Sequence, residues 1–466
     1  MNPKKRKSKP RPKKKPGETP LPESLRRVNL HAAGIDIGST EHWVAVPPGS
    51  APQPVRAFGS FTADLHALAD WLKACGVTTV AMESTGVYWI PLFQILETRG
   101  FQVLLVNARH VKNVPGRKSD VLDCQWLQEL HTFGLLRGSF RPEDEICVLR
   151  AYWRHRDNLI KAASAHIQQM QKALLQMNLQ LHHVISDVTG VTGLAIIRAI
   201  LAGERDPQRL AAFKDHRIKA SVETIAKALE GDYRTEHLFV LNQALELHDF
   251  YAGKIAACDR AIEAQLRGME SKVPEPKEPL GPSRQQHKKP ARNEPVCDLR
   301  GELHRLLGVD LTSIPGIQAT TAQTLLSELG TDIGKWKTEK HFASWLGLCP
   351  GVKITGGKAY KTRTRRVVNR AATALRLAAQ AVGRSKTALG AFYRRLKTRL
   401  GAPKANTATA HKLARMVYRL LKFGQAYVDR GDQAYEQHFK NRLLRNLQKQ
   451  ATHLGYQLIP QTETVS

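Results

Sequence analysis

Short apolar runs alternate with amphipathic ones through the first third of the chain. The run HAAGIDIG at residues 31–38 alternates apolar and small residues, which predicts a strand, and residues 42–46 after the Gly38-Ser39-Thr40 turn predict its hairpin partner. Further strands are predicted at residues 55–61, 78–82 and 103–106, and helices at 63–74 and 88–98. This alternation predicts a mixed α/β sheet domain over residues 31–150.

Helical patterns dominate the chain beyond residue 150. Residues 160–181 are rich in Ala, Gln, Leu and Met, and residues 238–266 repeat the pattern. Almost nothing breaks helix between 150 and 270, which predicts long paired helices, in part coiled-coil. The composition predicts six segments: a disordered basic arm (1–30), the α/β domain (31–150), the paired helices (151–270), a Pro-rich linker (271–300), a second, largely helical unit (301–435) and a C-terminal tail (436–466).

Basic residues strongly outnumber acidic ones. Lys and Arg total 71 against 41 acids, a net charge of +30, which suits a polyanionic partner better than a small metabolite. The basic arm can add non-specific phosphate contacts or serve only as a solubilising tail. The sequence shows no apolar run long enough for a membrane span and no secretory signal, so we expect a cytoplasmic protein without membrane contact. Six cysteines without a CxxC pair predict reduced thiols and no zinc site.

Four carboxylates stand where the predicted elements begin or end. Asp36 ends the first strand, Glu83 closes a later one, and Asp120 and Asp123 lie three apart on one face of a helix's first turn. This order and spacing are typical of a ribonuclease-H-type domain that holds two Mg²⁺ over a phosphodiester. Two such ions, about 3.5–4 Å apart, can activate the attacking oxygen and stabilise the leaving one. Singly, each acid could instead be a turn former, a helix-start acid or a partner of the helix dipole.

Two motifs in the second unit are suited to phosphate. Residues 311–317, LTSIPGI, followed by a helix at 319–329, predict a helix-hairpin-helix turn that brings backbone amides to a phosphate, although such turns also occur without a DNA role. A Gly-Gly pair at 356–357 then opens a dense basic stretch, for which a solvated face is the alternative explanation. The candidate nucleic-acid-binding residues are Lys358, Lys361, Arg363, Arg365, Arg366 and Arg370.

Several motifs together resemble a known family. The runs GIDIGST, AMESTGVYW, KNVPGRKSDVLDCQWL, SIPGIQATTAQTLLSELG, FASWLGLCPG and NRAATALRLAA look like the DEDD transposases of insertion sequences, relatives of the Piv DNA invertase. The resemblance covers most of residues 31–430. It implies an α/β plus α architecture, with an RNase H/RuvC-like nuclease domain, a helical coiled-coil insert and a mainly helical C-terminal transposase domain.

The same resemblance implies a function and its partners. It implies a bacterial, nucleoid-associated DNA transposase or site-specific recombinase that acts on double-stranded donor and target DNA. A structured non-coding bridge RNA would guide it, and the enzyme would assemble as a tetramer. The acids Asp36, Glu83, Asp120 and Asp123 would be the catalytic ligands of two Mg²⁺ ions.

The residue at the position of the family's nucleophile differs from the family's serine. The family's serine stands just before glycine at the start of the basic turn, and the matching residue here is Thr355. A threonine hydroxyl could attack phosphorus, although its β-methyl group restricts the approach. Either Thr355 replaces the serine, or this copy is impaired, or a nearby serine such as Ser385 takes the role. We favour the first interpretation.

Rival functions come from other classes. Residues 36–40 also resemble the first phosphate loop of actin-like ATPases, but the sequence shows neither the second loop nor the adenosine-binding glycine pair of that fold. A non-catalytic nucleic-acid-binding protein would explain the charge and leave the acids without a reason. A RuvC-like junction nuclease is the nearest enzymatic alternative, and it would need neither a C-terminal domain nor a covalent protein–DNA adduct.

Overall fold

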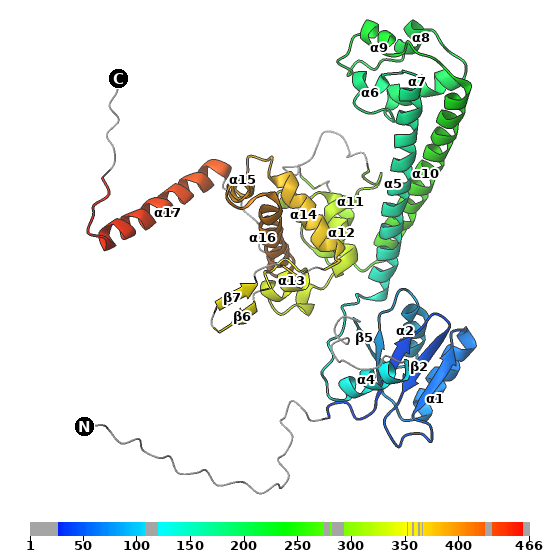
Figure 1. Cartoon of the computed structure of the whole chain (residues 1–466), viewed down its shortest axis with the longest axis vertical. Coiled ribbons are helices and arrows are strands. Elements are labelled where there is room, and N and C mark those ends of the chain that lie inside the picture. The colour runs from blue at the N-terminus through cyan, green and yellow to red at the C-terminus, as the bar shows by residue number, and fades with distance from the viewer. Residues whose placement is uncertain are drawn as a thin grey trace, which may run out of the picture. The chain divides into compact units, whose positions relative to one another are not determined.

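The computed structural model divides the chain into two compact units, Met1–Arg141 and Pro142–Ser466 (Figure 1). Residues 27–107, 120–274, 280–281, 293–351, 353–356, 358–361, 364–365, 367–424 and 431–459 are described, with only the backbone for 353, 354, 358, 359 and 361. Nearly all of the basic arm and most of the Pro-rich linker lie outside these residues. The finer division into six segments stays a prediction.

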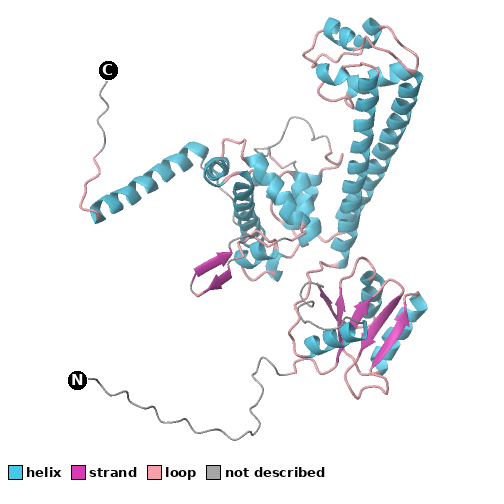
Figure 2. Cartoon of the chain, in the orientation of Figure 1, coloured by secondary structure: helices cyan, strands magenta, loops and turns pink. Residues whose placement is uncertain are grey.

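The N-terminal unit is built on one five-stranded sheet (Figure 2). Its strand order is β3-β2-β1-β4-β5; β2 pairs antiparallel with β1 and β3, whereas β4 runs parallel to both β1 and β5. The strands are β1 Ala32–Ile37, β2 Glu41–Ala45, β3 Val55–Gly59, β4 Thr79–Glu83 and β5 Gln102–Val106. All five strands were predicted, and their boundaries differ from the prediction by at most two residues.

Helices cover both faces of this sheet. The predicted helices α1 (Thr62–Ala74) and α2 (Trp89–Thr98) are confirmed, and their apolar residues share one core with Ile35 and Met82 of the strands. On the opposite face lies α4 (Asp120–Thr132), which carries the last two acids of the quartet. The sheet therefore has a core-forming face under α1 and α2 and a second face on which α4 packs.

Two long antiparallel helices begin the second unit, and a small globular cap joins them. Cys258 Sγ of α10 donates to Tyr152 O of α5 at 3.3 Å, and the Arg156–Asp259 ion pair also joins the two helices. The prediction of nearly unbroken helix was wrong for residues 177–234, which form four short helices that share an apolar core with the adjoining ends of α5 and α10. The elements are α5 Asp144–Gln176, α6 Leu181–Val184, α7 Val191–Leu201, α8 Pro207–Ala211, α9 Val222–Ala228 and α10 Thr235–Gly268.

Local capping signals explain the interruption. Pro207 begins α8 behind Asp206, whose carboxylate accepts from Gln208 N, and Ser221 caps α9 in the same way through Thr224 N. Such signals favour new helix starts over one continued helix. The cap is therefore encoded by polar residues that an apolar pattern alone does not reveal.

The remainder of the second unit is largely helical, as predicted, and closes around an aromatic cluster. Tyr418 Oη donates to Trp336 O at 2.8 Å, and Phe342 packs between their rings. One short hairpin, β6–β7, was not predicted. The elements are α11 Leu299–Leu307, η2 Leu311–Ser313, α12 Ala319–Leu329, η3 Ile333–Lys335, α13 Glu339–Trp345, β6 Lys353–Thr355, β7 Lys358–Lys361, α14 Arg370–Val382, α15 Ala388–Leu400, α16 Ala402–Phe423 and α17 Gly431–His453.

The cysteines and the helices bear on two expectations from the sequence. All six cysteines are free thiols, as predicted. Within the described ranges, no helix is both long and apolar enough to cross a membrane.

Candidate active site

Asp36 and Glu83 stand at the ends of two neighbouring strands. β1 and β4 are parallel, and the paired residues Ile35 and Met82 both belong to the core under α1 and α2. Because side chains alternate across a strand, the next residue on each strand, Asp36 or Glu83, points to the opposite face. Paired strands lie about 4.8 Å apart, so the two carboxylates leave the sheet as neighbours.

The helix α4 packs on that face with its first turn toward Asp36. Gln128 Nε2 donates to Ala32 O at 3.2 Å, and a Cβ atom at Gly34 would overlap the backbone of both Gln128 and Cys124. The helix therefore runs antiparallel to β1, and its N-terminal turn lies beyond Gly34 on the side of Asp36. The positioning role of Gly34 was not predicted, although a glycine inside a strand pattern, two residues before an acid, is a signal for close packing.

The thiol of Cys124 lies close to carboxylates from both elements. Cys124 is fully buried, and its Sγ donates to Val121 O at 3.1 Å. Burial raises the pKa of Cys124 to about 12, and the charges of Asp36 and Asp123 contribute to the rise because they disfavour a neighbouring thiolate. The structure thus brings the β1 acid and an α4 acid to the same place.

The acids have the chemistry of a Mg²⁺ site and lie in neighbouring positions. Carboxylate oxygens are the ligands that Mg²⁺ prefers. Asp120 begins α4 one turn before Asp123, so the two side chains project from the same side of the helix. In the conformation described, however, no three acidic, histidine or cysteine side chains of the described residues are placed to hold a metal ion. The run 108–119, which leads into α4, lies outside those residues, and metal binding by the quartet stays a prediction.

Thr355 lies at the turn of the unpredicted hairpin. β6 and β7 pair antiparallel with Thr355 opposite Lys358, and Gly356 directly follows Thr355. Gly356 has φ +55°, the left-handed conformation that such tight hairpin turns require. Thr355 itself is exposed. The hydroxyl of the expected nucleophile is therefore accessible on a defined turn.

The alternative nucleophile, Ser385, is engaged in the structure. Its Oγ donates to Val382 O at 2.8 Å and lies 2.7 Å from the Oγ1 atom of Thr387. Thr387 in turn caps α15 by accepting from Gly390 N. These contacts give Ser385 a structural role between α14 and α15, which favours Thr355 as the candidate.

The predicted basic residues are only partly described. Arg363 and Arg366 lie outside the described residues, as do the side chains of Lys358 and Lys361. Arg365 is exposed, and its Nη2 atom lies 3.5 Å from Ser344 O. This long contact leaves most of the guanidinium donors of Arg365 facing solvent.

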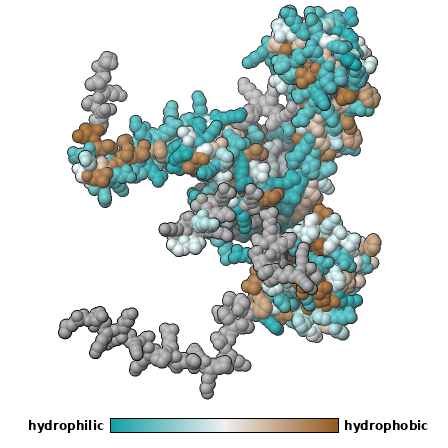
Figure 3. All heavy atoms as spheres, viewed as in Figure 1, coloured by the Kyte–Doolittle hydropathy of each residue, from teal (hydrophilic) through white to brown (hydrophobic). Residues whose placement is uncertain are grey.

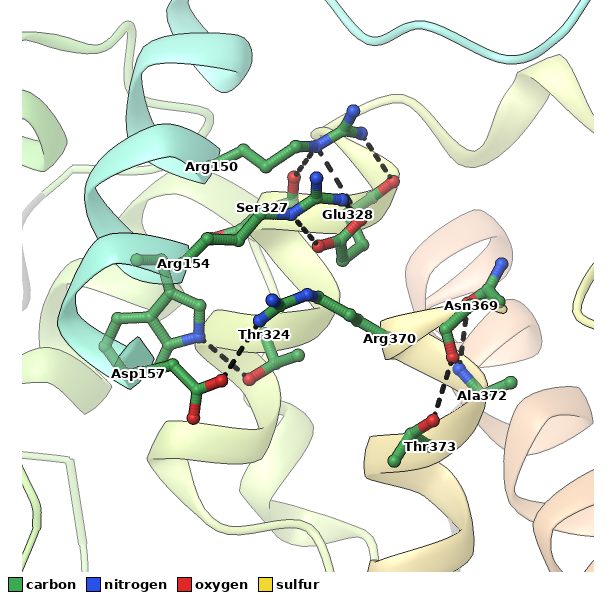
Figure 4. A network of polar contacts seen from close by, with 11 residues as sticks. Arg150, Arg154, Asp157, Thr324, Ser327, Glu328, Asn369, Arg370, Ala372 and Thr373 are labelled. Carbon is green, nitrogen blue, oxygen red and sulfur yellow. Dashed lines mark hydrogen bonds and ion pairs between the residues drawn. The ribbon is translucent and has the colours of Figure 1, made fainter. Parts of the chain in front are cut away.

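Arg370 is held by an acid from a distant part of the sequence. It begins α14, and its Nη1 donates to Asp157 Oδ2 of α5 at 3.1 Å (Figure 4). Nearby, Arg154 of α5 makes two hydrogen bonds of 2.9 and 2.8 Å to Glu328 of α12. These contacts join α5 to α12 and α14. In this conformation Arg370 is engaged by a protein carboxylate, and its role in nucleic-acid binding stays a prediction.

The predicted helix-hairpin-helix turn has a packing role. Gly316 has φ +87°, and a Cβ atom there would overlap Val382 of α14 and lie 2.8 Å from Ala378 O. Ile314 and Ile317 on either side are fully buried. The glycine thus allows the turn to press against α14, which is sufficient reason for it, and contact of this turn with phosphate stays a prediction.

Two parts of the chain match known transposase families. Residues 33–179 match the IS110-type DEDD transposase family, and residues 310–394 match the transposase IS116/IS110/IS902 family. No curated protein matches the chain. The first match contains Asp36, Glu83, Asp120 and Asp123, and the second contains the β6–β7 hairpin with Thr355. The two matches occur in the order expected from the sequence motifs, and the chain belongs to the IS110-type family of DEDD transposases.

Proposed function

We propose that this transposase cuts and rejoins DNA strands at the sheet face where Asp36 and Glu83 stand, with Asp120 and Asp123 completing the acidic quartet. The observation that carries the proposal is the adjacency of Asp36 and Glu83 beside the first turn of α4. The strand order, with acids on two central strands and on a helix packed across β1, also favours an RNase H/RuvC-like domain.

The quartet would hold two Mg²⁺ ions. Four carboxylates on one face would repel each other unless cations were bound between them. The pKa of the nearby Cys124 is raised mainly by burial, and the charges of Asp36 and Asp123 add to the rise. Bound Mg²⁺ would supply Lewis-acid stabilisation of the phosphate and activation of the attacking oxygen. The role of the protein would be to hold the carboxylates in place, and the β1–β4 pairing and the packing of α4 on Gly34 support this role.

Thr355 would be the nucleophile of strand exchange. Its Oγ1 atom would form a phosphoester bond with the scissile phosphorus while the P–O bond to the DNA leaving oxygen breaks, and the hydroxyl proton would pass to solvent. The accessible position of Thr355 on a tight hairpin and the engagement of Ser385 in a cap both support this assignment.

Double-stranded donor and target DNA are the proposed substrates, and a bridge RNA is the proposed guide. The net charge of +30 supports polyanionic partners, and the family membership supports DNA. The antiparallel α5–α10 pair would be the coiled-coil insert. A tetramer in the bacterial cytoplasm, bound to the nucleoid, completes the proposal.

Trapping the covalent intermediate tests this function. The purified chain, incubated with Mg²⁺ and duplex DNA that carries the element's ends, should form a protein–DNA adduct that mass spectrometry maps to Thr355. Thr355→Ser should keep or raise adduct formation, because serine offers the same oxygen with less crowding, whereas Thr355→Val should lose it. An adduct at Ser385, or cleavage without any adduct, would contradict the assignment and favour a plain RuvC-like nuclease.

A further inference from the structure

The C-terminal part of the helix α17 is positively charged and exposed. From Gln437 to Ile459 the sequence contains four Lys or Arg residues and no Asp or Glu. None of the residues of α17 is buried. This helix also lies beyond residue 394, where the second family match ends. The family matches therefore do not account for the basic composition of this helix.

Three of the four Lys or Arg residues of α17 lie on one face of the helix. Arg442, Arg445 and Lys449 follow the i, i+3, i+7 spacing, which places them along one stripe of the helix, and we call these three residues the basic stripe. Leu443 and Leu447 lie on a different side and are also exposed; Figure 3 shows apolar brown patches on α17 beside hydrophilic teal. The stripe is therefore a one-sided feature of an amphipathic helix.

Other arginines of this unit are neutralised by acids. Glu339 binds both Arg415 and Arg419, and Asp432 lies 3.3 Å from Arg394. Within the part of the chain that the structure describes, no ion pair involves the basic stripe. Like charges three and four residues apart destabilise an isolated helix, so the stripe is unfavourable unless an external anion neutralises it.

The first turns of α17 contact α15, whereas the basic stripe is exposed. The guanidinium of Arg395 on α15 lies 5.5 Å from the ring centroid of Tyr435 and 4.0 Å from that of Phe439. Together with the Arg394–Asp432 pair, these contacts attach the start of α17 to α15. The anchoring residues precede the stripe, so a ligand could bind the stripe without displacing them.

We propose that the basic stripe of α17 binds the sugar-phosphate backbone of a nucleic acid. This inference rests on the proposed function, which supplies the nucleic acid. Arg442 and Lys449 are seven residues apart, roughly 10 Å along a helix, which is a length that spans neighbouring phosphates of one strand. Contacts of this kind position a nucleic acid without reading its sequence. The backbone could belong to DNA or to RNA, which share this chemistry.

Salt-dependent binding of the full chain tests the proposal. Binding of labelled duplex DNA and of a structured RNA of similar length should be measured without Mg²⁺ by fluorescence anisotropy over a range of NaCl concentrations. The triple variant Arg442→Gln, Arg445→Gln, Lys449→Gln should bind about 10- to 100-fold more weakly at moderate salt and lower the salt slope by about two to three units. The rescue variant Arg442→Lys, Arg445→Lys should retain the slope, because lysine also binds phosphate as a point charge.

Lys440 provides the matched control. It lies on the same helix, is also exposed, and stands on the side of Leu443 and Leu447. Lys440→Gln should change the dissociation constant by less than about twofold, far less per charge than the triple variant. Circular dichroism should show the same helix content in all variants, because every substituted side chain is exposed.

The possible results distinguish binding of DNA from binding of RNA, and support for the proposal from its failure. Weakened binding of DNA, of RNA or of both supports the proposal and identifies the backbone that is bound. An unchanged slope with both ligands, or an equal loss per charge in Lys440→Gln, overturns it. Because binding is measured without cleavage, a failure of the proposed transposition chemistry would leave this result interpretable.

Discussion

Asp36 and Glu83 each follow a residue of the Ile35–Met82 pair that joins β1 to β4, so their carboxylates leave neighbouring strands on the same face. Forty-seven positions in sequence separate acids that the parallel pairing makes neighbours. The first turn of α4 reaches this face because Gly34 permits close packing. The candidate site therefore depends on backbone pairing and on one glycine as much as on the acids.

Gly34→Val should damage the site without changing any acid. The added side chain would overlap the backbone of α4, so we expect the free energy of unfolding of the N-terminal domain to fall by about 1–3 kcal/mol. Displacement of α4 should also move Asp120 and Asp123 and reduce Mg²⁺-dependent cleavage. Thermal unfolding and a cleavage assay measure the two effects.

Gly253→Ala is the control for that substitution. Gly253 lies inside α10, and a Cβ atom there meets nothing within 4 Å. Alanine should therefore be neutral or stabilise the helix by up to about 1 kcal/mol. If Gly34→Val unfolded at the same temperature as the wild type and cleaved normally, the packing argument would be wrong.

Glu339 should make the second unit sensitive to acid. Hydrogen bonds from Arg419 and Arg415 lower the pKa of Glu339 to about 2, from 4.5. Since the folded-state pKa lies below the unfolded value, this stabilisation is complete above about pH 4.5 and is lost as pH falls toward about 2. Glu339→Gln should cost about 1–3 kcal/mol near neutral pH, a range that allows for the partial exposure of both arginines.

Unfolding of wild type and Glu339→Gln at neutral and at acidic pH measures this contribution. The difference between the two proteins should shrink as pH falls through the range below about 4.5. Glu436→Gln, which removes an exposed acid from α17, serves as the control and should change little at either pH. A difference that stayed constant with pH would show that the loss at Glu339 is not electrostatic.

Asp157 should restrain nucleic-acid binding by Arg370. Asp157→Asn removes the carboxylate that holds Arg370, so we expect tighter DNA binding and a salt slope steeper by about one unit. Arg365→Ala, which removes an exposed cation, should instead weaken binding across sequences and reduce the slope by about one unit. Anisotropy titrations at several salt concentrations measure both.

Asp249→Asn is the matched control for Asp157→Asn. Asp249 forms a comparable exposed ion pair, with 2.8 Å between its Oδ2 and Arg198 Nη2. The two variants change the net charge equally. A similar gain in affinity from both would indicate a general effect of charge and would remove the specific role of Arg370.

Local patterns predicted the parts of the fold that local physics determines. The short runs of apolar and small residues that end at Asp36 and Glu83 indicated the two strands, because both strands are almost wholly buried. The spacing of Asp120 and Asp123 placed both on the first turn of α4. These predictions needed only the periods of strand and helix.

Tertiary contacts determine what the sequence did not reveal. The Arg370–Asp157 pair joins residues 213 positions apart, and nothing near either residue indicates the other. Gly34 and Gly316 are explained only by the helices packed against them. The strands of the β6–β7 hairpin have three and four residues, which is too short for an alternating pattern to stand out.

Direct metal binding tests the central claim, that the acidic quartet of the N-terminal domain holds the catalytic metals. Mn²⁺, used as a paramagnetic substitute for Mg²⁺, should be titrated into the full-length wild type, Asp36→Asn and Asp70→Asn and followed by electron paramagnetic resonance. Asp70 lies on α1, which covers the opposite face of the sheet, so its variant changes the charge equally and leaves the quartet intact. We predict two bound ions in the wild type and in Asp70→Asn, and loss of at least one ion in Asp36→Asn. Equal Mn²⁺ binding by all three proteins would contradict the account.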